Sequence, residues 1–142
     1  MGRSYWFECG KCGYRAKVSG RAESGVYFAS ETISCRDCKQ LYDAVTRVKV
    51  PDLNEEETKA APAGVLGSKF LKQLHIGKVP PTFQSVSNRL PFRGVKRFRW
   101  LAFRPQCPSS PLHRVESWAD PGKCPRCGVF LERSGLPYHL WD

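Results

Sequence analysis

The chain has 142 residues, with 23 lysine and arginine against 13 aspartate and glutamate residues, so its formal net charge is +10. That length allows one medium domain or two to three small ones. No apolar run approaches the roughly 18 residues needed to span a bilayer, which excludes a membrane-spanning protein. There are seven cysteines, and the first residues lack the apolar stretch of a secretory signal. We therefore expect a cytoplasmic protein, because closely spaced cysteines in a reducing compartment bind metal more often than they pair.

Charge and cysteine content divide the chain into four segments. Residues 1–50 are moderately basic and hold four of the cysteines. Residues 51–64 are acidic and poor in apolar side chains, which is typical of a linker or an exposed loop. Residues 65–105 hold nine basic and no acidic residues, and residues 106–142 are neutral and hold the other three cysteines. We expect two cysteine modules at the ends, joined by the acidic linker and the basic segment.

The predicted elements are mostly short strands, taken here in chain order. Aromatic and β-branched residues bounded by glycine or cysteine turns predict the first strands. These strands are Ser4–Glu8, Tyr14–Val18, Val26–Ser34 and Leu41–Val50. Apolar spacing then predicts one short amphipathic helix over Val65–Ile76, and a further strand follows at Val95–Phe103. The apolar tail, 134–142, is expected to pack onto the C-terminal module.

The strongest motif is a pair of Cys-x2-Cys sequences in the first segment. Cys9 and Cys12 form the first pair, and Cys35 and Cys38 form the second. Two residues between the cysteines of a pair let both sulfurs face one ion. The residues between the first pair and the second suffice for two strands and a turn, which would bring the second pair back beside the first. Gly13 provides the positive φ that such a turn needs. This spacing predicts a tetrahedral four-sulfur zinc site, with Zn–S distances of about 2.3 Å.

These residues resemble the zinc-ribbon family, in which two metal-binding turns are joined through a small antiparallel sheet. The resemblance covers roughly residues 5–50 and implies a small β fold around a structural zinc ion. The second pair departs from the family pattern, because Lys39 stands where a glycine often follows, and we expect that turn to be made differently. Zinc ribbons serve both nucleic-acid and protein recognition, so the resemblance implies a fold more than a function.

The last segment predicts a second zinc site with a mixed ligand set. The sequence Cys124-Pro-Arg-Cys127-Gly matches the form of the first turn and resembles the second turn of zinc ribbons and rubredoxins. Only Cys107 remains as a third sulfur, and His113 is the favoured fourth ligand, because three cysteines and one histidine are an accepted structural zinc set. His139 and Asp120 stay open as alternatives.

Iron is the competing metal, because the turns at both ends of the chain resemble those of rubredoxin and four thiolates also hold iron. An iron site built from Cys9, Cys12, Cys124 and Cys127 would leave the Cys35–Cys38 pair without partners. On that argument we expect two structural Zn²⁺ ions, one in each cysteine module.

The basic segment contains the candidate contact surface for nucleic acid. Alternation along the expected strand places Phe98, Trp100 and Ala102 on one face, with lysine and arginine at its ends. Cations suit phosphates and aromatic rings suit unstacked bases. The candidate nucleic-acid-binding residues are Arg93, Lys96, Arg97, Arg99, Trp100 and Arg104. An acidic protein partner is the alternative, because the same cations would attract carboxylates.

Catalytic motifs are missing from the sequence. There is no phosphate-binding glycine loop, nucleophile elbow or His-Glu-x2-His motif. Glu116 is a weak candidate base. Cys107 would be a nucleophile only if His113 acted as its general base instead of binding a metal. We expect a small, mostly-β, metal-stabilised protein without enzymatic activity or a small-molecule substrate. It would bind DNA or RNA, or alternatively act as an adaptor that docks on an acidic protein.

Overall fold

The computed structural model describes residues 2–51, 82–83 and 97–141. All nine elements assigned within those residues are β-strands, and no helix there is long and apolar enough to cross a membrane. The expected helix over 65–76 lies outside the described residues. The strands are β1 (Gly2–Glu8), β2 (Arg15–Val18), β3 (Glu23–Ser24), β4 (Phe28–Cys35), β5 (Gln40–Pro51), β6 (Phe98–Ala102), β7 (Val115–Ser117), β8 (Glu132–Arg133) and β9 (His139–Trp141).

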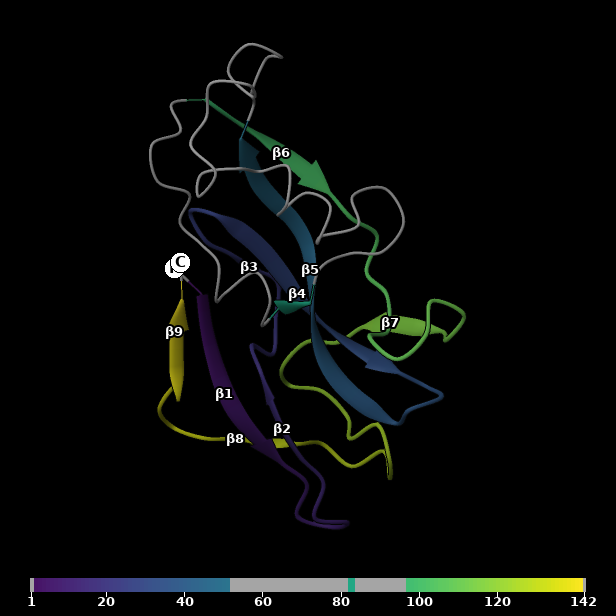
Figure 1. The fold of residues 1–142 in the computed structure, drawn as a ribbon. Helices are drawn as coiled ribbons and strands as arrows, with labels where there is room; N and C mark the ends of the chain where they lie inside the picture. The colour runs from purple at the N-terminus through teal and green to yellow at the C-terminus, as the bar shows by residue number, and fades with distance from the viewer. Residues whose placement is uncertain (1, 52–81, 84–96, 142) are drawn as a thin grey trace.

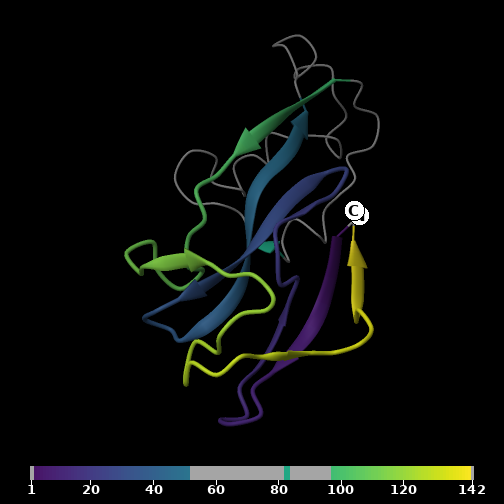
Figure 2. The ribbon, with the colours of Figure 1, turned by 180° about the vertical axis from the view of Figure 1, so that it is seen from behind.

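The strands form two antiparallel sheets. In the first sheet β1 is central, with β2 on one edge and both β8 and β9 on the other. In the second sheet the order is β3-β4-β5-β6, and β7 also pairs with β4. Figure 2 shows the long β5 running through the second sheet to its ladder with β6, at the end away from the β4–β5 turn. Each sheet therefore combines strands from the beginning and the end of the chain.

The two sheets share one construction. Each contains a hairpin whose turn carries a Cys-x2-Cys sequence: β1–β2 in the first sheet and β4–β5 in the second. Each hairpin then receives a late strand on the free edge of its first strand, β8 on β1 and β7 on β4. Because β7 precedes β8 in the chain, the second unit is nested inside the first, between its hairpin and its late strand.

Most of the expected strands are present, but the tail is placed differently from the prediction. The tail was expected to pack onto the C-terminal module, whereas β9 pairs with β1 through the register Gly2↔Trp141. Figure 1 shows β1 and β9 side by side. The Trp141 ring stacks on Phe28 with a centroid distance of 4.3 Å. The open edge of β1 and this aromatic contact explain why the tail lies against N-terminal strands.

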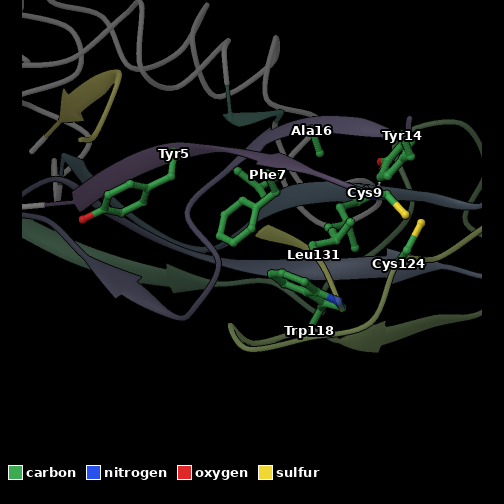
Figure 3. Packing of buried hydrophobic residues seen from close by; sticks show 10 residues of the cluster. Tyr5, Phe7, Cys9, Tyr14, Ala16, Trp118, Cys124 and Leu131 are labelled. Carbon is green, nitrogen blue, oxygen red and sulfur yellow. Dashed lines mark hydrogen bonds between the residues drawn. The ribbon is translucent and has the colours of Figure 1, made fainter. Parts of the chain in front are cut away.

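Two clusters of buried side chains form the core. The first cluster lies under β1 and β2, where Phe7 is fully buried and meets Trp118 edge to face at 5.2 Å. Figure 3 shows this cluster, with the sulfurs of Cys9 and Cys124 turned toward each other at one end. The second cluster lies on β4 and β5 and includes Trp141. Because the first cluster contains Cys9 and Cys124, its packing positions two of the candidate metal ligands.

A buried carboxylate joins the two sheets. Asp43 on β5 accepts hydrogen bonds from the backbone N–H of Ser19 at 3.0 Å and from the Thr32 hydroxyl at 2.8 Å. The Thr32 hydroxyl in turn accepts the N–H of Gly20 at 2.8 Å. Burial raises the pKa of Asp43, opposed by the hydrogen bonds from Ser19 and Thr32. These contacts hold the segment after β2 against the β4–β5 hairpin.

Candidate metal centres and a basic aromatic face

The eight residues proposed as metal ligands gather into two groups of four. Within each group the ligand atoms all lie within 4.8 Å of one another. We call these groups the four-cysteine site and the cysteine–histidine site. The four-cysteine site is formed by Cys9, Cys12, Cys124 and Cys127, and the cysteine–histidine site by Cys35, Cys38, Cys107 and His113.

The partition of the ligands differs from the one expected from the sequence. The two N-terminal pairs were expected to share one ion, but Cys9 and Cys12 face Cys124 and Cys127 instead. The argument against that arrangement was that Cys35 would lose its partners. That premise is wrong, because Cys35 and Cys38 meet Cys107 and His113. The reason is topological: the late strands β7 and β8 bring the C-terminal ligands back beside separate hairpins.

The distances between ligand atoms suit a tetrahedral metal ion. A zinc ion with Zn–S bonds of about 2.3 Å and Zn–N bonds of about 2.0 Å separates two sulfurs by about 3.8 Å and a sulfur and a nitrogen by about 3.5 Å. In the four-cysteine site, Cys9 and Cys127 have sulfurs 3.3 Å apart, and Cys12 and Cys124 have sulfurs 3.6 Å apart. All seven cysteines are free thiols.

The cysteine–histidine site has matching dimensions. The Cys38 sulfur lies 3.6 Å from the Cys107 sulfur and 3.4 Å from Nδ1 of His113. The Cys35 sulfur lies 3.7 Å from the same nitrogen. The donor set and the spacing both fit a structural zinc ion bound through Nδ1 of the histidine.

The three Cys-x2-Cys turns have one common geometry. In the first, the N–H of Cys9 donates to the carbonyl of Tyr14, and the N–H of Gly13 donates back to Cys9. The turn at Cys124 repeats this pattern with Val129 and Gly128. The residue after the second cysteine has a positive φ in all three turns: Gly13 at 76°, Lys39 at 51° and Gly128 at 79°.

The sequence led us to expect that the turn at Cys38 would be made differently from the other two. That expectation is wrong, because the turn has the same backbone geometry. Lys39 adopts the left-handed conformation that glycine adopts in the other two turns. A lysine there costs about 1–2 kcal/mol in backbone strain. Its carbonyl accepts the Nε–H of Arg126 at 3.4 Å, so this turn also contacts the last turn of the four-cysteine site.

Backbone amides around the sulfurs favour the thiolate form that binds metal. At Cys9 the N–H of Cys12 is the main influence, and it helps lower the pKa of the Cys9 thiol to about 6. At Cys107 burial acts in the opposite direction, but the N–H of Ser109 and the His113 side chain outweigh it, and the pKa is again about 6. Hydrogen bonds with Cys107 and Cys38 raise the pKa of His113. One thiolate in each site is thus favoured, whereas the pKa is raised for the thiols of Cys12, Cys35 and Cys127. The raised pKa of His113 favours the imidazolium, which must lose a proton before it binds a metal.

The other candidate ligands lie elsewhere. His139 is exposed on β9, where its ring lies 6.0 Å from that of Tyr138. Asp120 forms an ion pair with Arg133 at 3.3 Å. Glu116, the candidate base, forms an ion pair with Arg36 on the surface. Of the histidines and carboxylates considered for the fourth position, His113 is the one placed with Cys107.

The strand β6 adds a basic aromatic face to the second sheet. Lys49 on β5 lies opposite Trp100 on β6, so alternation places both on the same side as Arg47 and Phe98. The Arg47 guanidinium lies 4.9 Å from the Trp100 ring centroid, and the Lys49 ammonium lies 5.2 Å from that of Phe98. Trp100 remains 44% exposed. We call these four residues the β5–β6 face.

Only part of the nucleic-acid surface expected from the sequence can be placed. Arg93 and Lys96 lie outside the described residues, Arg97 lies just before β6, and Arg104 follows it. Arg99 pairs with Val50 on the opposite side of β6 from Trp100. Sequence reasoning missed Arg47 and Lys49. Their alternation with Val48 and Val50 was visible, but the pairing of their strand with residues 98–102 was not.

Comparison of the chain with protein-family models, with curated proteins and with solved structures found no match.

Proposed function

We propose that the chain is a non-enzymatic protein that holds two structural zinc ions and contacts nucleic acid through the β5–β6 face. The zinc assignment is supported by two sets of four protein ligands, because a complete tetrahedral set leaves no position for a substrate or an activated water molecule. A bound zinc would fasten the beginning of the chain to its end at each site. This structural role of zinc resembles its role in the zinc-ribbon family. Cysteines that stay reduced would suit a location in the cytoplasm.

Zinc is preferred over iron because the two sites differ in ligands. Four thiolates accept either metal, but a set of three cysteines and one histidine is an established structural zinc site. Metal analysis of the purified protein should find close to two zinc ions per chain, and the protein should be colourless because zinc(II) has a filled d shell. Visible absorption with equimolar iron would assign the four-cysteine site to iron instead.

The nucleic-acid assignment is supported by the arrangement of cations and exposed rings on the β5–β6 face. Trp100 offers an accessible ring surface on a rigid strand, and base stacking on such a ring contributes about 1–3 kcal/mol per base. Arg47 and Lys49 lie over neighbouring rings, where they would reach the phosphates on either side of a stacked base. A sheet face with these groups suits single strands better than duplexes, whose bases are already stacked.

A binding titration at several salt concentrations tests this proposal. The probes are single- and double-stranded DNA and RNA of equal length, with poly-glutamate of matched charge as a non-nucleic polyanion. We expect single strands to bind most tightly, with affinity falling as salt rises because counterions are released. Trp100→Ala should weaken single-strand binding by about 10- to 100-fold, the equivalent of one lost stacked base.

Two lysine variants separate specific contacts from general charge. Lys49→Gln should make the salt dependence shallower by about one contact. Lys123→Gln removes the same charge from an exposed position beside the four-cysteine site and should leave the affinity for single strands unchanged. Equal affinity for poly-glutamate, or no salt-dependent binding at micromolar protein, would contradict nucleic-acid recognition.

An adaptor role is the second candidate, supported by exposed apolar residues near the C-terminus. Phe130 is 58%, Leu136 81% and Leu140 55% exposed. Exposed apolar side chains in one region commonly mark protein contacts. Tight poly-glutamate binding that Trp100→Ala leaves unchanged would favour an acidic protein partner over nucleic acid.

A further inference from the structure

The two metal centres differ in how far their cysteines are exposed. In the four-cysteine site Cys12 is exposed and Cys127 is partly exposed, while the other two cysteines are buried. In the cysteine–histidine site no cysteine is exposed, since two are buried and one is partly exposed. Oxidation of a cysteine requires access to its sulfur as well as thiolate character. A dissolved oxidant therefore meets the four-cysteine site before the other one.

The sulfurs of the four-cysteine site form two close pairs, and each pair joins the turn at Cys9 to the turn at Cys124. The sulfurs of Cys9 and Cys127 lie 3.3 Å apart, and those of Cys12 and Cys124 lie 3.6 Å apart. Because the S–S bond of a disulfide is about 2.05 Å long, each pair would close by about 1–2 Å. The two pairs use all four sulfurs, whereas the three sulfurs of the cysteine–histidine site allow one disulfide and leave one thiol over.

Disulfides between the turns would hold the same two parts of the chain that a metal ion holds. The cysteines of the two close pairs are separated by 118 and 112 positions in the sequence. A cross-link over so long a loop restricts the unfolded chain strongly. Disulfides within the turns, Cys9–Cys12 and Cys124–Cys127, would instead leave the end of the chain unattached to its beginning. Pairing between the turns therefore preserves the first sheet when the metal is lost.

We propose that the four-cysteine site is an oxidation site at which a hydroperoxide converts the four thiolates into two disulfides, Cys9–Cys127 and Cys12–Cys124. In the zinc-loaded chain this reaction frees one zinc ion, while the cysteine–histidine site keeps its own. The release of zinc rests on the proposed function, but the pairing of the cysteines does not.

The reaction begins at the exposed sulfur. The Cys12 thiolate attacks one oxygen of the hydroperoxide, the O–O bond breaks, and the other oxygen takes a proton and leaves as an alcohol, or as water from hydrogen peroxide. The Cys124 thiolate then attacks the sulfenic sulfur of Cys12, which forms the S–S bond and releases the hydroxyl group, with a second proton, as water. Two thiolates thus lose two electrons to the peroxide bond. A second hydroperoxide reacts in the same way at Cys127 and Cys9.

The test is treatment of the zinc-loaded full chain with hydrogen peroxide. A chromogenic chelator measures the released zinc, and circular dichroism follows the sheets. Free thiols are then blocked by alkylation, and mass spectrometry of the unreduced peptides identifies the disulfides. We expect release of one zinc ion per chain, two disulfides between the turns, an unchanged sheet signal, and alkylated cysteines at the cysteine–histidine site. Dithiothreitol with added zinc should restore the starting protein.

Replacement of the exposed sulfur provides a matched variant. Cys12→Ser should lose the Cys12–Cys124 disulfide and still form Cys9–Cys127, so that peroxide yields one disulfide per chain instead of two. The cysteine–histidine site of the same molecule is the internal control in both proteins. The disulfide map of the parent decides the proposal even where the variant fails to fold.

Several results would overturn the oxidation site. Disulfides within the turns, disulfides between two molecules, or equally fast oxidation of the cysteine–histidine site would each do so. A purified chain without zinc would contradict the proposed function instead. The two predicted disulfides in that metal-free chain would still support the oxidation site.

Discussion

Double replacement of cysteines by alanine tests how the ligands are divided between the two sites. The structure puts Cys9 with Cys124, and Cys35 in the other site. Replacing Cys9 and Cys124 together therefore damages one site and leaves the other complete. Replacing Cys9 and Cys35 together damages both. All three cysteines are buried, so the two double variants remove similar packing.

The expected results differ in both zinc content and stability. The Cys9→Ala/Cys124→Ala protein should retain one zinc ion per chain, and the Cys9→Ala/Cys35→Ala protein should retain none. Binding at a structural zinc site contributes about 10–16 kcal/mol in peptide models. The whole free energy of unfolding of a domain is about 5–15 kcal/mol. Either contribution is as large as the stability of a domain, so loss of both sites should unfold the chain. Loss of the four-cysteine site alone should unfold the first sheet and leave the second sheet, which keeps its own complete set of ligands, folded.

The assay is metal analysis combined with circular dichroism, on proteins purified under reducing conditions. The division expected from the sequence, with Cys9 and Cys35 in one site, gives the opposite result. One zinc ion in Cys9→Ala/Cys35→Ala and none in Cys9→Ala/Cys124→Ala would refute the structural division. The single Cys9→Ala variant, expected to keep one zinc ion, is the control that a lone substitution does not unfold the chain.

Three further predictions concern the turns, the thiolates and the junction between the sheets. Gly13→Ala should destabilise the protein by about 1 kcal/mol in chemical denaturation because of its left-handed φ, whereas Gly10→Ala should have little effect, since a methyl group at either position meets no atom within 4 Å. The pKa values of the Cys9 and Cys107 thiols are lowered from 9.0 to about 6. The affinity for zinc, measured by competition with a chromogenic chelator, should therefore fall more steeply below about pH 6, where protons also compete for these two thiolates, and full retention of zinc against the chelator at pH 4 would contradict the assignment. Asp43→Ala should lower the free energy of unfolding by about 2–4 kcal/mol, because the donors that meet this carboxylate would be buried without a partner, and a change below about 0.5 kcal/mol would show that the carboxylate does not join the sheets.

The sequence predicted the local structure well where the signal lies within a few residues. The strand of alternating residues that became β5 and the aromatic strand β1 were recognisable from their composition. The Cys-x2-Cys turns were recognisable for the same reason, since both sulfurs and the left-handed residue lie within five positions. Lys39 was the exception, because backbone sterics disfavour a left-handed lysine without forbidding it.

The sequence could not supply the pairing of distant elements. Residue spacing allowed Cys9 and Cys12 to meet either Cys35 and Cys38 or Cys124 and Cys127, and the shorter loop was the natural choice. The chain makes the longer connection because β8 and β9 cover the open edge of β1, whereas β7 covers that of β4. The basic aromatic face depends on the same kind of long-range pairing, since it joins residues of β5 and β6.

By itself, then, the sequence determined which residues could bind a metal and which strands and turns carry them, because these depend on residue type and on short spacing. The tertiary structure alone decided which turn meets which, how His113 completes one site, and where the cations gather. Those features follow from strand pairing between residues as far apart in the chain as Gly2 and Trp141. Such pairing is governed by edge hydrogen bonds and buried contacts, which produce no periodic pattern in the sequence.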